Sequence, residues 1–322
     1  MRSVTKTPSH SHVRAVRKKR AKPRESAVLT DRVIDGFTLK EKIGEGGTAV
    51  VYAAEDREKR RFAVKIALSK KFNGILDNES ERLGQLDHPA ILKGISSGTT
   101  YGRSYIATEY LEGQSLAHEM GKPGIIPWEK AKKIVMRLCD ALHELHRKGL
   151  AHRDVTPGNI HLLPDGSIKL LDFGLTQEFD QCFPQKPGSI EGSPKYMAPE
   201  AAAGLKHDHR ADIYSTGVIL YALMTGDLPL RGDSEGETLM KHINEDPQKP
   251  SERAKHLDFS EGADEVVMKA LDKDPTKRYQ SILELKEAIS EISIYHGLSC
   301  CTAYATLEAG EITEVGAAAA AC

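Results

Sequence analysis

The sequence has no long hydrophobic run and few cysteines. None of its apolar stretches approaches the roughly 20 residues that a transmembrane helix needs, and the first residues are basic and serine-rich, where a secretory signal would be apolar. The five cysteines are odd in number and lack metal-ligand spacing, which argues against structural zinc and against a closed disulfide framework. These absences indicate a soluble protein in a reducing environment, and we expect a cytoplasmic location.

Charge is nearly balanced overall but unevenly distributed along the chain. The 322 residues carry a formal net charge of −1 and 39% hydrophobic residues, enough for one large core or two lobes. Residues 1–24, however, contain many lysines and arginines and no acidic residue. Because such a block repels itself, we expect residues 1–35 to form a basic, disordered tail. The tail could bind nucleic acid or an anionic membrane surface, although a solvated tail is the simpler interpretation.

The first part of the folded region has the pattern of a small antiparallel sheet. Three runs alternate apolar and polar side chains between turn signals, and they predict strands at residues 37–39, 50–53 and 62–66. Leucines at helical intervals then predict a helix that ends before Pro89. That helix covers residues 76–86, and two further strands are expected at 91–97 and 104–111.

Beyond residue 113 the pattern becomes mostly helical. Apolar side chains keep a 3.6-residue period from Trp128 to Arg147, and Gly149 supplies a stop signal. A hairpin is expected around residues 164–167, between strands at 160–163 and 168–171. Later helices are expected at residues 213–224, 238–245, 263–271 and 281–292. Strands followed by helices predict an α+β protein of two lobes, joined near residues 109–113. Residues 296–322, with five consecutive alanines, are expected to form a poorly ordered tail.

Two segments flanking the predicted hairpin contain the residue types of a phosphoryl-transfer site. The first holds Asp154 and Asn159 within the letters AHRDVTPGN at residues 151–159, and the second is Asp172-Phe173-Gly174. Phosphoryl transfer needs a carboxylate to orient the attacking hydroxyl and further oxygen ligands to hold magnesium on the phosphates. In order and spacing, the two segments resemble the catalytic loop and the metal-binding loop of the eukaryotic-type protein kinases.

The resemblance implies a role for each polar residue of these segments. Asp154 would be the catalytic base, while Asn159 and Asp172 would bind Mg²⁺, or Mn²⁺ in its place. His152 would support the loop rather than transfer a proton. Arg153 would be the residue through which a phosphorylated activation segment communicates with the site.

A glycine-rich segment in the first predicted hairpin fits the same family. Residues 43–51 read IGEGGTAVV, and glycine lets the backbone approach phosphate oxygens because no Cβ intervenes. The segment resembles the kinase loop that covers the phosphates of ATP, with Ala49 in place of the usual third glycine. The resemblance implies that ATP is bound here and on the third strand by Ile43, Gly44, Glu45, Gly46, Gly47, Val51 and Ala63.

A lysine and a glutamate complete the expected nucleotide site. Lys65, on the third predicted strand, would contact the α- and β-phosphates and pair with a carboxylate of the following helix. Glu79 is our choice for that carboxylate because it stands nine residues before the histidine of an Asp-His-Pro segment, as in related kinases. Glu81 is the competing candidate. The resemblance also implies that adenine is held by the backbone at Glu109 and Leu111.

Landmarks in the second half extend the resemblance to about residue 294. Residues 192–200 read GSPKYMAPE and resemble the segment that receives a peptide substrate. The resemblance implies that Glu200 pairs with Arg278 and that Asp212 supports the catalytic loop. Ser189 lies just upstream, where activation-segment phosphorylation often occurs, and is our candidate regulatory site.

One residue departs from the pattern. Serine/threonine kinases usually carry lysine two positions after the catalytic aspartate, and Thr156 cannot supply that charge to the γ-phosphate. Rate and acceptor class therefore stay open, tyrosine included. A weakly active or inactive signalling scaffold is one alternative, which the intact Lys65 and Asp154 oppose. A small-molecule kinase is another, which the presence of Glu200, Asp212 and Arg278 opposes.

The sequence as a whole predicts an ATP- and Mg²⁺-dependent serine/threonine protein kinase, most similar to bacterial members of the family. The kinase domain is expected over residues 36–295, with an N-lobe at about 36–110 and a C-lobe at about 113–295. Protein substrates, a signalling role and autophosphorylation are expected from the resemblance.

Overall fold

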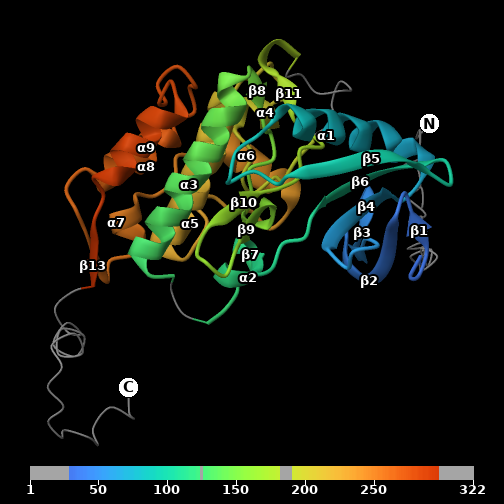
Figure 1. Ribbon diagram of the computed structural model, residues 1–322. Helices are drawn as coiled ribbons and strands as arrows, with labels where there is room; N and C mark the ends of the chain where they lie inside the picture. Colours follow the sequence, from blue (N-terminus) through green and yellow to red (C-terminus); the bar gives the residue numbers. More distant parts are fainter. Residues whose placement is uncertain (1–28, 124–125, 182–190, 297–322) are drawn as a thin grey trace, which may run out of the picture.

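The computed structural model describes residues 29–123, 126–181 and 191–296, which form two lobes (Figure 1). The smaller N-lobe is built around a sheet and the larger C-lobe is mostly helical. This arrangement confirms the two-lobed α+β architecture expected from the sequence. Within these ranges, every helix is too short or too polar to cross a bilayer.

The N-lobe sheet has six antiparallel strands in the order β1-β2-β3-β4-β6-β5. All strands expected in this lobe are present. The first three are longer than predicted, because the pattern marks only their buried centres, whereas β5 begins three residues later and β6 ends two residues earlier than predicted. The registers place Val51 opposite Lys65 and Ala63 opposite Thr108, so the residues expected to meet ATP lie on adjoining strands. The strands are β1 (Val33–Ile34), β2 (Phe37–Glu45), β3 (Ala49–Glu55), β4 (Arg61–Ala67), β5 (Gly94–Thr100) and β6 (Arg103–Glu109).

The N-lobe core begins earlier in the chain than the sequence suggested. Leu29 and Ile34 are buried in a cluster with Leu39, Tyr52 and other sheet residues, and the backbone N–H of Leu29 donates to the Tyr52 hydroxyl at 3.3 Å. The sequence pattern predicts a tail over residues 1–35, whereas the structure places Leu29 and Ile34 in the core. Because single apolar residues in a polar stretch carry no periodic signal, the sequence did not mark this short first strand.

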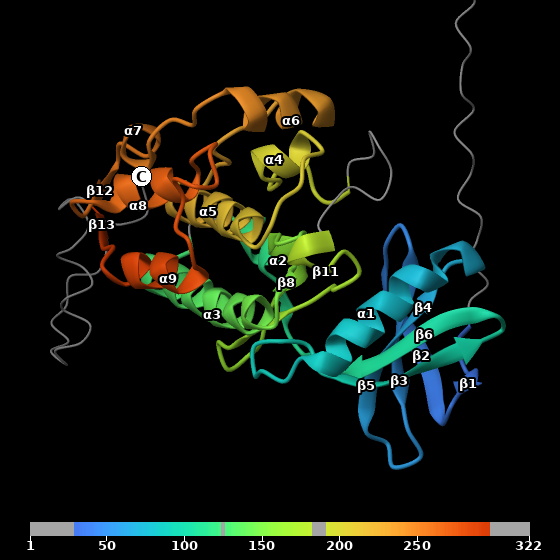
Figure 2. The same cartoon turned by 90° about the horizontal axis from the view of Figure 1, so that it is seen from above.

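Helix α1 (Asn73–Gln85) lies beside the sheet, against β5 and β6 (Figure 2). It follows a 3₁₀ turn at Lys70–Phe72. Leu76 and Leu83 are buried on its inner face, as their spacing predicts, and they join a core that continues into the C-lobe. Glu79 is buried on this helix as well, at 2% exposure, which directs its carboxylate toward the sheet and the space between the lobes.

The C-lobe is organised around α3 (Trp128–Arg147) and α5 (Arg210–Thr225), which pack side by side (Figure 2). Helix α3 has the bounds that its apolar periodicity predicts. Helix α5 is buried on nearly all sides, and α9 (Ile282–Ser290) covers α3. The other helices are α2 (Leu116–Met120), α4 (Pro199–Ala202), α6 (Glu235–Asn244), α7 (Pro250–Arg253) and α8 (Ala263–Ala270).

Three small sheets lie in the described part of the C-lobe. The predicted hairpin is formed by β9 (Ile160–Leu162) and β10 (Ile168–Leu170), and β7 (Gln114–Ser115) pairs with β9. The other two pairs are β8 (Leu150–Ala151) with β11 (Gln177–Glu178), and β12 (Leu257–Phe259) with β13 (Ile294–His296). The β9–β10 hairpin positions the site, because the catalytic-loop motif leads into it and Asp172-Phe173-Gly174 follows it.

The connection between the lobes depends on a glycine. After β6, Gly113 has a φ of 109°, a conformation that residues with a side chain rarely adopt. A Cβ at this position would lie 2.0 Å from the carbonyl oxygen of Leu162 on β9. The chain can therefore cross from the N-lobe to the C-lobe at this close distance only without a side chain.

Candidate active site

A cavity of about 520 Å³ lies between the lobes. Its upper wall is the sheet with the loop between β2 and β3, and its lower wall is the catalytic loop with the β9–β10 hairpin. Every residue that the sequence assigned to nucleotide binding lines it: Ile43, Gly44, Glu45, Gly46, Gly47, Val51, Ala63, Lys65, Glu79, Glu109 and Leu111. Asn159 and Asp172 line the same cavity, so the expected metal ligands lie beside the expected nucleotide residues.

Lys65 is held between two carboxylates at one end of this cavity. Its Nζ donates to Glu79 Oε1 at 2.8 Å and Oε2 at 2.6 Å, and lies 3.4 Å from Asp172 Oδ1. Strand β4 supplies the lysine, α1 supplies Glu79, and the segment after β10 supplies Asp172. The competing candidate, Glu81, is exposed on α1. The three side chains thus join the sheet, the helix and the C-lobe at one point.

Mutual attraction sets the charges of this group. Burial lowers the pKa of Lys65, but the carboxylates of Glu79 and Asp172 outweigh burial and leave that pKa raised. Burial raises the pKa of Asp172, yet Lys65 and the backbone N–H of Gly174 leave it below its ordinary value. For Glu79 burial exceeds the attraction of Lys65, so its pKa is raised. At neutral pH Lys65 is a cation and Asp172 an anion, as phosphate and metal binding require.

Asp154 and Asn159 are joined on the catalytic loop. The Asn159 Nδ2 donates to the backbone carbonyl and to Oδ2 of Asp154, both at 2.9 Å. The other carboxylate oxygen, Oδ1 of Asp154, is buried and has no hydrogen-bond partner among the residues that the structure describes. Buried acceptors without a partner are uncommon and costly. This oxygen therefore has the capacity to accept a further hydrogen bond.

Asp212 fixes the catalytic loop from below. Its carboxylate, at the start of α5, accepts the backbone N–H of His152 at 2.8 Å and that of Arg153 at 2.9 Å. His146 Nε2 lies 2.9 Å from the same carboxylate. Burial raises the pKa of Asp212, but His146 and the N–H groups outweigh burial and leave it lowered. Burial lowers the pKa of His146, so we infer a neutral imidazole that donates to Asp212.

Two residues of the site have backbone strain. Arg153 has a φ of 71° and Asp172 a φ of 61°, values that cost about 1–3 kcal/mol in residues other than glycine. The hydrogen bonds to Asp212 hold Arg153 in place, and the N–H of Gly174 donates to Asp172 Oδ1 at 3.3 Å. His152 links the two strained positions, since its Nε2 lies 3.1 Å from the Leu171 carbonyl and its ring packs against Phe173.

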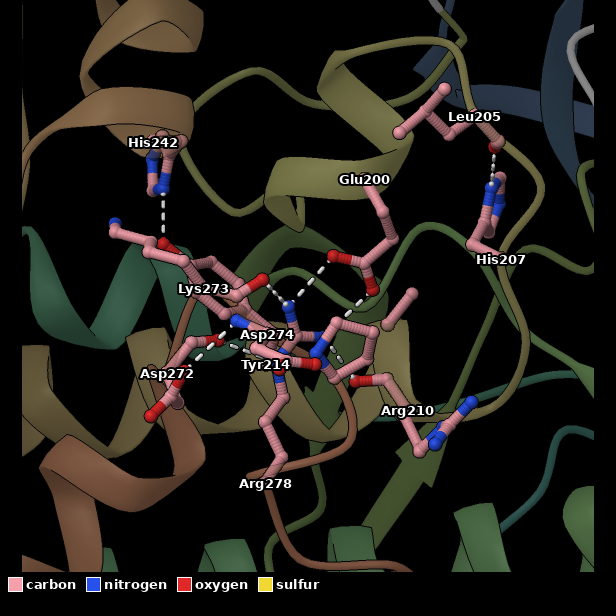
Figure 3. A network of polar contacts seen from close by, with 12 residues as sticks. Glu200, Leu205, His207, Arg210, Tyr214, His242, Asp272, Lys273, Asp274 and Arg278 are labelled. Atoms are coloured by element: carbon pink, nitrogen blue, oxygen red, sulfur yellow. Dashed lines mark hydrogen bonds and ion pairs between the residues drawn. The ribbon is translucent and has the colours of Figure 1, made fainter.

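The segment with the GSPKYMAPE motif packs against the catalytic loop. Gly192 has a φ of 109°, and a Cβ there would lie 3.3 Å from the Arg153 carbonyl and 3.6 Å from Asp154 Oδ1. Farther along, Glu200 on α4 forms a buried ion pair with Arg278 (Figure 3). The sequence analysis expected both this pair and the support of the catalytic loop by Asp212, and the structure contains both. Ser189 lies outside the described residues.

Other residues of the cavity escaped sequence reasoning. Leu92, Ile106, His161 and Leu171 also line it. The apolar residues among them give the same signal whether they face a core or a ligand, and His161 stands in no recognisable motif, so the sequence offered no way to single them out. Thr156, the departure from the family motif, is buried at 7% exposure just before a 3₁₀ turn at Pro157–Asn159 and does not line the cavity.

The oxygen atoms of the site suit a divalent cation. Asp172 contributes a carboxylate, and Asn159 contributes the amide oxygen that remains because its NH₂ group binds Asp154. Carboxylate and amide oxygens are the donors that Mg²⁺ prefers, and Mg²⁺ commonly takes only one or two of them from a protein. The residues present therefore fit a magnesium ion that is also bound by phosphates.

Comparisons with known proteins show which family this chain resembles over most of its length. The family model described as protein kinase domain matches residues 37–290. The serine/threonine-protein kinase PknB of Mycobacterium leprae is 35% identical over 263 residues, 78% of this chain and 42% of its own length. A Clostridium perfringens protein, named as a probable serine/threonine-protein kinase, is 33% identical over 255 residues, 77% of this chain and 37% of its own length. This chain thus spans about two fifths of the length of these relatives.

Proposed function

This chain belongs to the protein kinase domain family, and from that premise we propose that it transfers the γ-phosphoryl group of ATP to serine or threonine hydroxyls of proteins, with Mg²⁺ as the metal. The observation that carries the proposal is that Lys65, Asn159 and Asp172 line one cavity between the lobes, with Lys65 in contact with Asp172 and Asp154 hydrogen-bonded to Asn159. A cation for phosphate, oxygen ligands for a metal and an acceptor for a hydroxyl proton are the groups that phosphoryl transfer uses.

ATP would occupy the cavity with its adenine at the connection between the lobes. The backbone at Glu109 and Leu111 would bind the base. Thr108, at 7% exposure, would form the wall of the pocket behind the base. The glycine-rich loop between β2 and β3 would cover the phosphates, with N–H groups directed toward their oxygens. Lys65, kept extended by Glu79, would contact the α- and β-phosphates.

The metal would neutralise the phosphates during transfer. Asp172 and Asn159 would hold Mg²⁺, or Mn²⁺ as an alternative, through their oxygens. When bound there, the metal would supply charge stabilisation for the phosphoryl group. Because Lys65 contacts Asp172 directly, movement of this carboxylate would disturb the phosphate-binding lysine and the metal site together.

Asp154 would orient the acceptor hydroxyl and take its proton. Its Oδ1 is buried without a partner in the described part of the chain, and Asn159 fixes Oδ2. A hydroxyl group that donates to Oδ1 would satisfy this oxygen and would be directed toward the γ-phosphate. General-base assistance of this kind is typically worth about 10²–10⁴-fold in rate.

The absence of a lysine at Thr156 favours a second candidate, a weakly active signalling scaffold. The same position in serine/threonine kinases usually supplies a cation to the γ-phosphate, and a buried threonine cannot. A small-molecule kinase is less compatible with the structure, because Gly192 and the buried Glu200–Arg278 pair build the platform on which related kinases bind a peptide.

Radiolabelled ATP tests the proposal directly. Wild-type protein and Asp154→Asn would be incubated with [γ-³²P]ATP, Mg²⁺ and protein acceptors, and the labelled residues identified by mass spectrometry. We expect phosphoserine or phosphothreonine with wild type and a loss of about 10²–10⁴-fold in the variant. Nucleotide binding without transfer by wild type would favour the scaffold. Equal transfer by both proteins would contradict the role of Asp154.

We further propose a signalling role in the cytoplasm, based on the family. The basic residues between 14 and 24 would bind nucleic acid or an anionic membrane through their charge. Removal of residues 1–28, which leaves Leu29 in the core, should abolish any binding that weakens with salt. If binding to both DNA and anionic vesicles is absent in the full chain at low salt, the segment has no such role.

A further inference from the structure

The segment that follows Asp172 forms a tight turn between the two lobes. The Thr176 N–H donates to the Phe173 carbonyl at 3.1 Å, which closes a turn over Gly174 and Leu175. The three carbonyl groups from Gly174 to Thr176 accept hydrogen bonds from side chains of both lobes. Arg153, on the catalytic loop, donates to the Leu175 carbonyl at 3.4 Å. The turn is thus tied to the C-lobe on one side.

Asn78 ties the same turn to the N-lobe. This residue precedes Glu79 on α1, and its Nδ2 donates to the Gly174 carbonyl at 3.3 Å and to the Thr176 carbonyl at 3.2 Å. Both hydrogens of the amide are needed for these two contacts. Arg82, one turn later on α1, adds an ion pair with Glu178 at 3.5 Å. Helix α1 therefore contacts the segment on the C-terminal side of Asp172 at two successive turns.

The contact between α1 and the turn is close enough that a displacement of the turn would also displace Asp172. A Cβ on Gly174 would lie 3.0 Å from Ile75 Cγ2, 3.3 Å from Asp172 Oδ1 and 4.0 Å from Glu79 Oε2. Helix α1, the turn and the metal-binding carboxylate thus meet without intervening space. If the turn moved away from α1, Asp172 would move with it, and Lys65 would lose one of its two carboxylate partners.

We propose that Asn78 is a positioning residue for phosphoryl transfer, which clamps the turn at residues 173–176 to α1 so that Asp172 keeps its place beside the Lys65–Glu79 pair. Asn78 would act through the backbone of the turn, since it is not among the residues that line the cavity. This inference rests on the proposed function for its effect on rate, whereas the clamp itself is a property of the protein without ligand.

Variants of Asn78 can be matched with a second asparagine of the same helix. Asn73 also makes two hydrogen bonds, to the Gly102 carbonyl and from the Ser104 N–H, but both lie within the N-lobe. Asn73→Ala therefore controls for a loosened helix. Asn78→Asp is isosteric and places a carboxylate against two carbonyl oxygens. Asn78→Gln keeps the donors and serves as the conservative variant.

Steady-state kinetics with ATP and Mg²⁺ give the first readout. We expect kcat to fall about tenfold in Asn78→Asp, the effect of losing one to two net hydrogen bonds. The KM for ATP should change by a smaller factor than kcat, because the adenine and loop contacts remain while only the contacts of Lys65 and Asp172 are disturbed. Asn78→Gln should recover part of kcat, and Asn73→Ala should lower it less. A fall in Asn78→Asp no larger than in Asn73→Ala would overturn the proposal.

Hydrogen exchange of the unliganded protein gives a readout that needs no activity. We expect faster exchange of amides at residues 174–178 in Asn78→Asp and Asn78→Ala, but not in Asn73→Ala. Unchanged exchange there would overturn the clamp even if the enzyme were active. If wild type proved inactive while exchange increased as expected, the clamp would stand and the proposed function would fail, so the two results are distinguishable.

Discussion

The guanidinium of Arg278 meets both carboxylate oxygens of Glu200 at 2.7 Å, although 78 residues separate them in the chain. Its remaining donors reach backbone carbonyls of Asp272, Arg210 and Lys273 at 2.7–3.3 Å (Figure 3). The Arg278 side chain has no exposed surface. A buried charge is tolerated when every donor has a partner, and this guanidinium meets that condition. The pair fastens α4, and with it the segment that follows Gly192, to the base of the C-lobe.

Removal of one partner of this pair should strongly destabilise the protein. We expect Arg278→Met to lower the free energy of unfolding by about 3–5 kcal/mol, because Glu200 would stay buried without its cation. Urea unfolding at pH 7 measures the change. Lys286→Met is the control, since the ion pair of Lys286 with Asp140 is partly exposed and should contribute at most about 1 kcal/mol. Similar losses in the two variants would contradict a special role of the buried pair.

The free energy of unfolding should decrease as the pH falls from about 6.5 toward 4, because of His242. Burial, aided by the charge of Lys273, lowers the pKa of this histidine from 6.5 to about 4. Below about pH 6.5 the unfolded chain binds a proton before the folded protein does. The contribution of His242 is therefore fully present above that pH and is lost as the pH falls toward 4, by at most about 3 kcal/mol.

The variant His242→Asn isolates this effect. It cannot titrate in this range, and its amide can still meet the Tyr214 hydroxyl, which lies 2.8 Å from Nδ1 of His242. We expect the unfolding free energy of the variant to depend less steeply on pH between 6.5 and 4.5 than that of wild type. Parallel curves for the two proteins would show that His242 titrates normally.

Much of the fold could be predicted because its apolar pattern is regular. Helix α3 has the predicted bounds, Trp128–Arg147, since one face of it is buried over its whole length. Strands of two residues, such as β8 and β11, were missed because two residues carry no period. The burial of Leu29 was not predicted either, because it depends on a tertiary contact with Tyr52.

The site could be predicted only where its residues stand in recognisable motifs. Lys65 and Asp172 were named from such motifs, and the structure places them 3.4 Å apart across 107 residues of chain. Asn78 was not named, because an asparagine on a helix gives no sign of what it contacts. Its partners are backbone carbonyls of a turn, and their position follows from the packing of α1 against the C-lobe.

Magnesium and ATP together should stabilise the protein through Asp172. A ligand at 100 times its dissociation constant adds about 2.7 kcal/mol to the unfolding free energy. We expect ATP with Mg²⁺ to raise the melting temperature and EDTA to remove most of that increase. In Asp172→Asn, the part that depends on Mg²⁺ should be lost, while ATP alone should still bind through the cavity walls. Asp165→Asn, an exposed loop carboxylate, is the control, and an equal loss there would exclude a metal role for Asp172.

The link between the lobes should be intolerant of any side chain at residue 113. Gly113→Ala and Gly166→Ala both place an alanine at positive φ, 109° and 78°, which alone costs about 1–2 kcal/mol. Only at Gly113 would the new Cβ strike the backbone, 2.0 Å from the Leu162 carbonyl, whereas nothing lies within 4 Å at Gly166. Relief of this clash requires the chain to move away from β9, at a further cost of about 1–3 kcal/mol.

The difference between these two alanine variants in urea unfolding isolates the clash from the strain of positive φ. The same movement would displace Leu111, two residues earlier, from the wall of the cavity between the lobes. We therefore expect Gly113→Ala to bind ATP more weakly than Gly166→Ala does, in addition to being less stable. Equal stability of the two variants would mean that the chain relaxes at residue 113 without cost. Equal ATP affinity would mean that the connection between the lobes does not position Leu111.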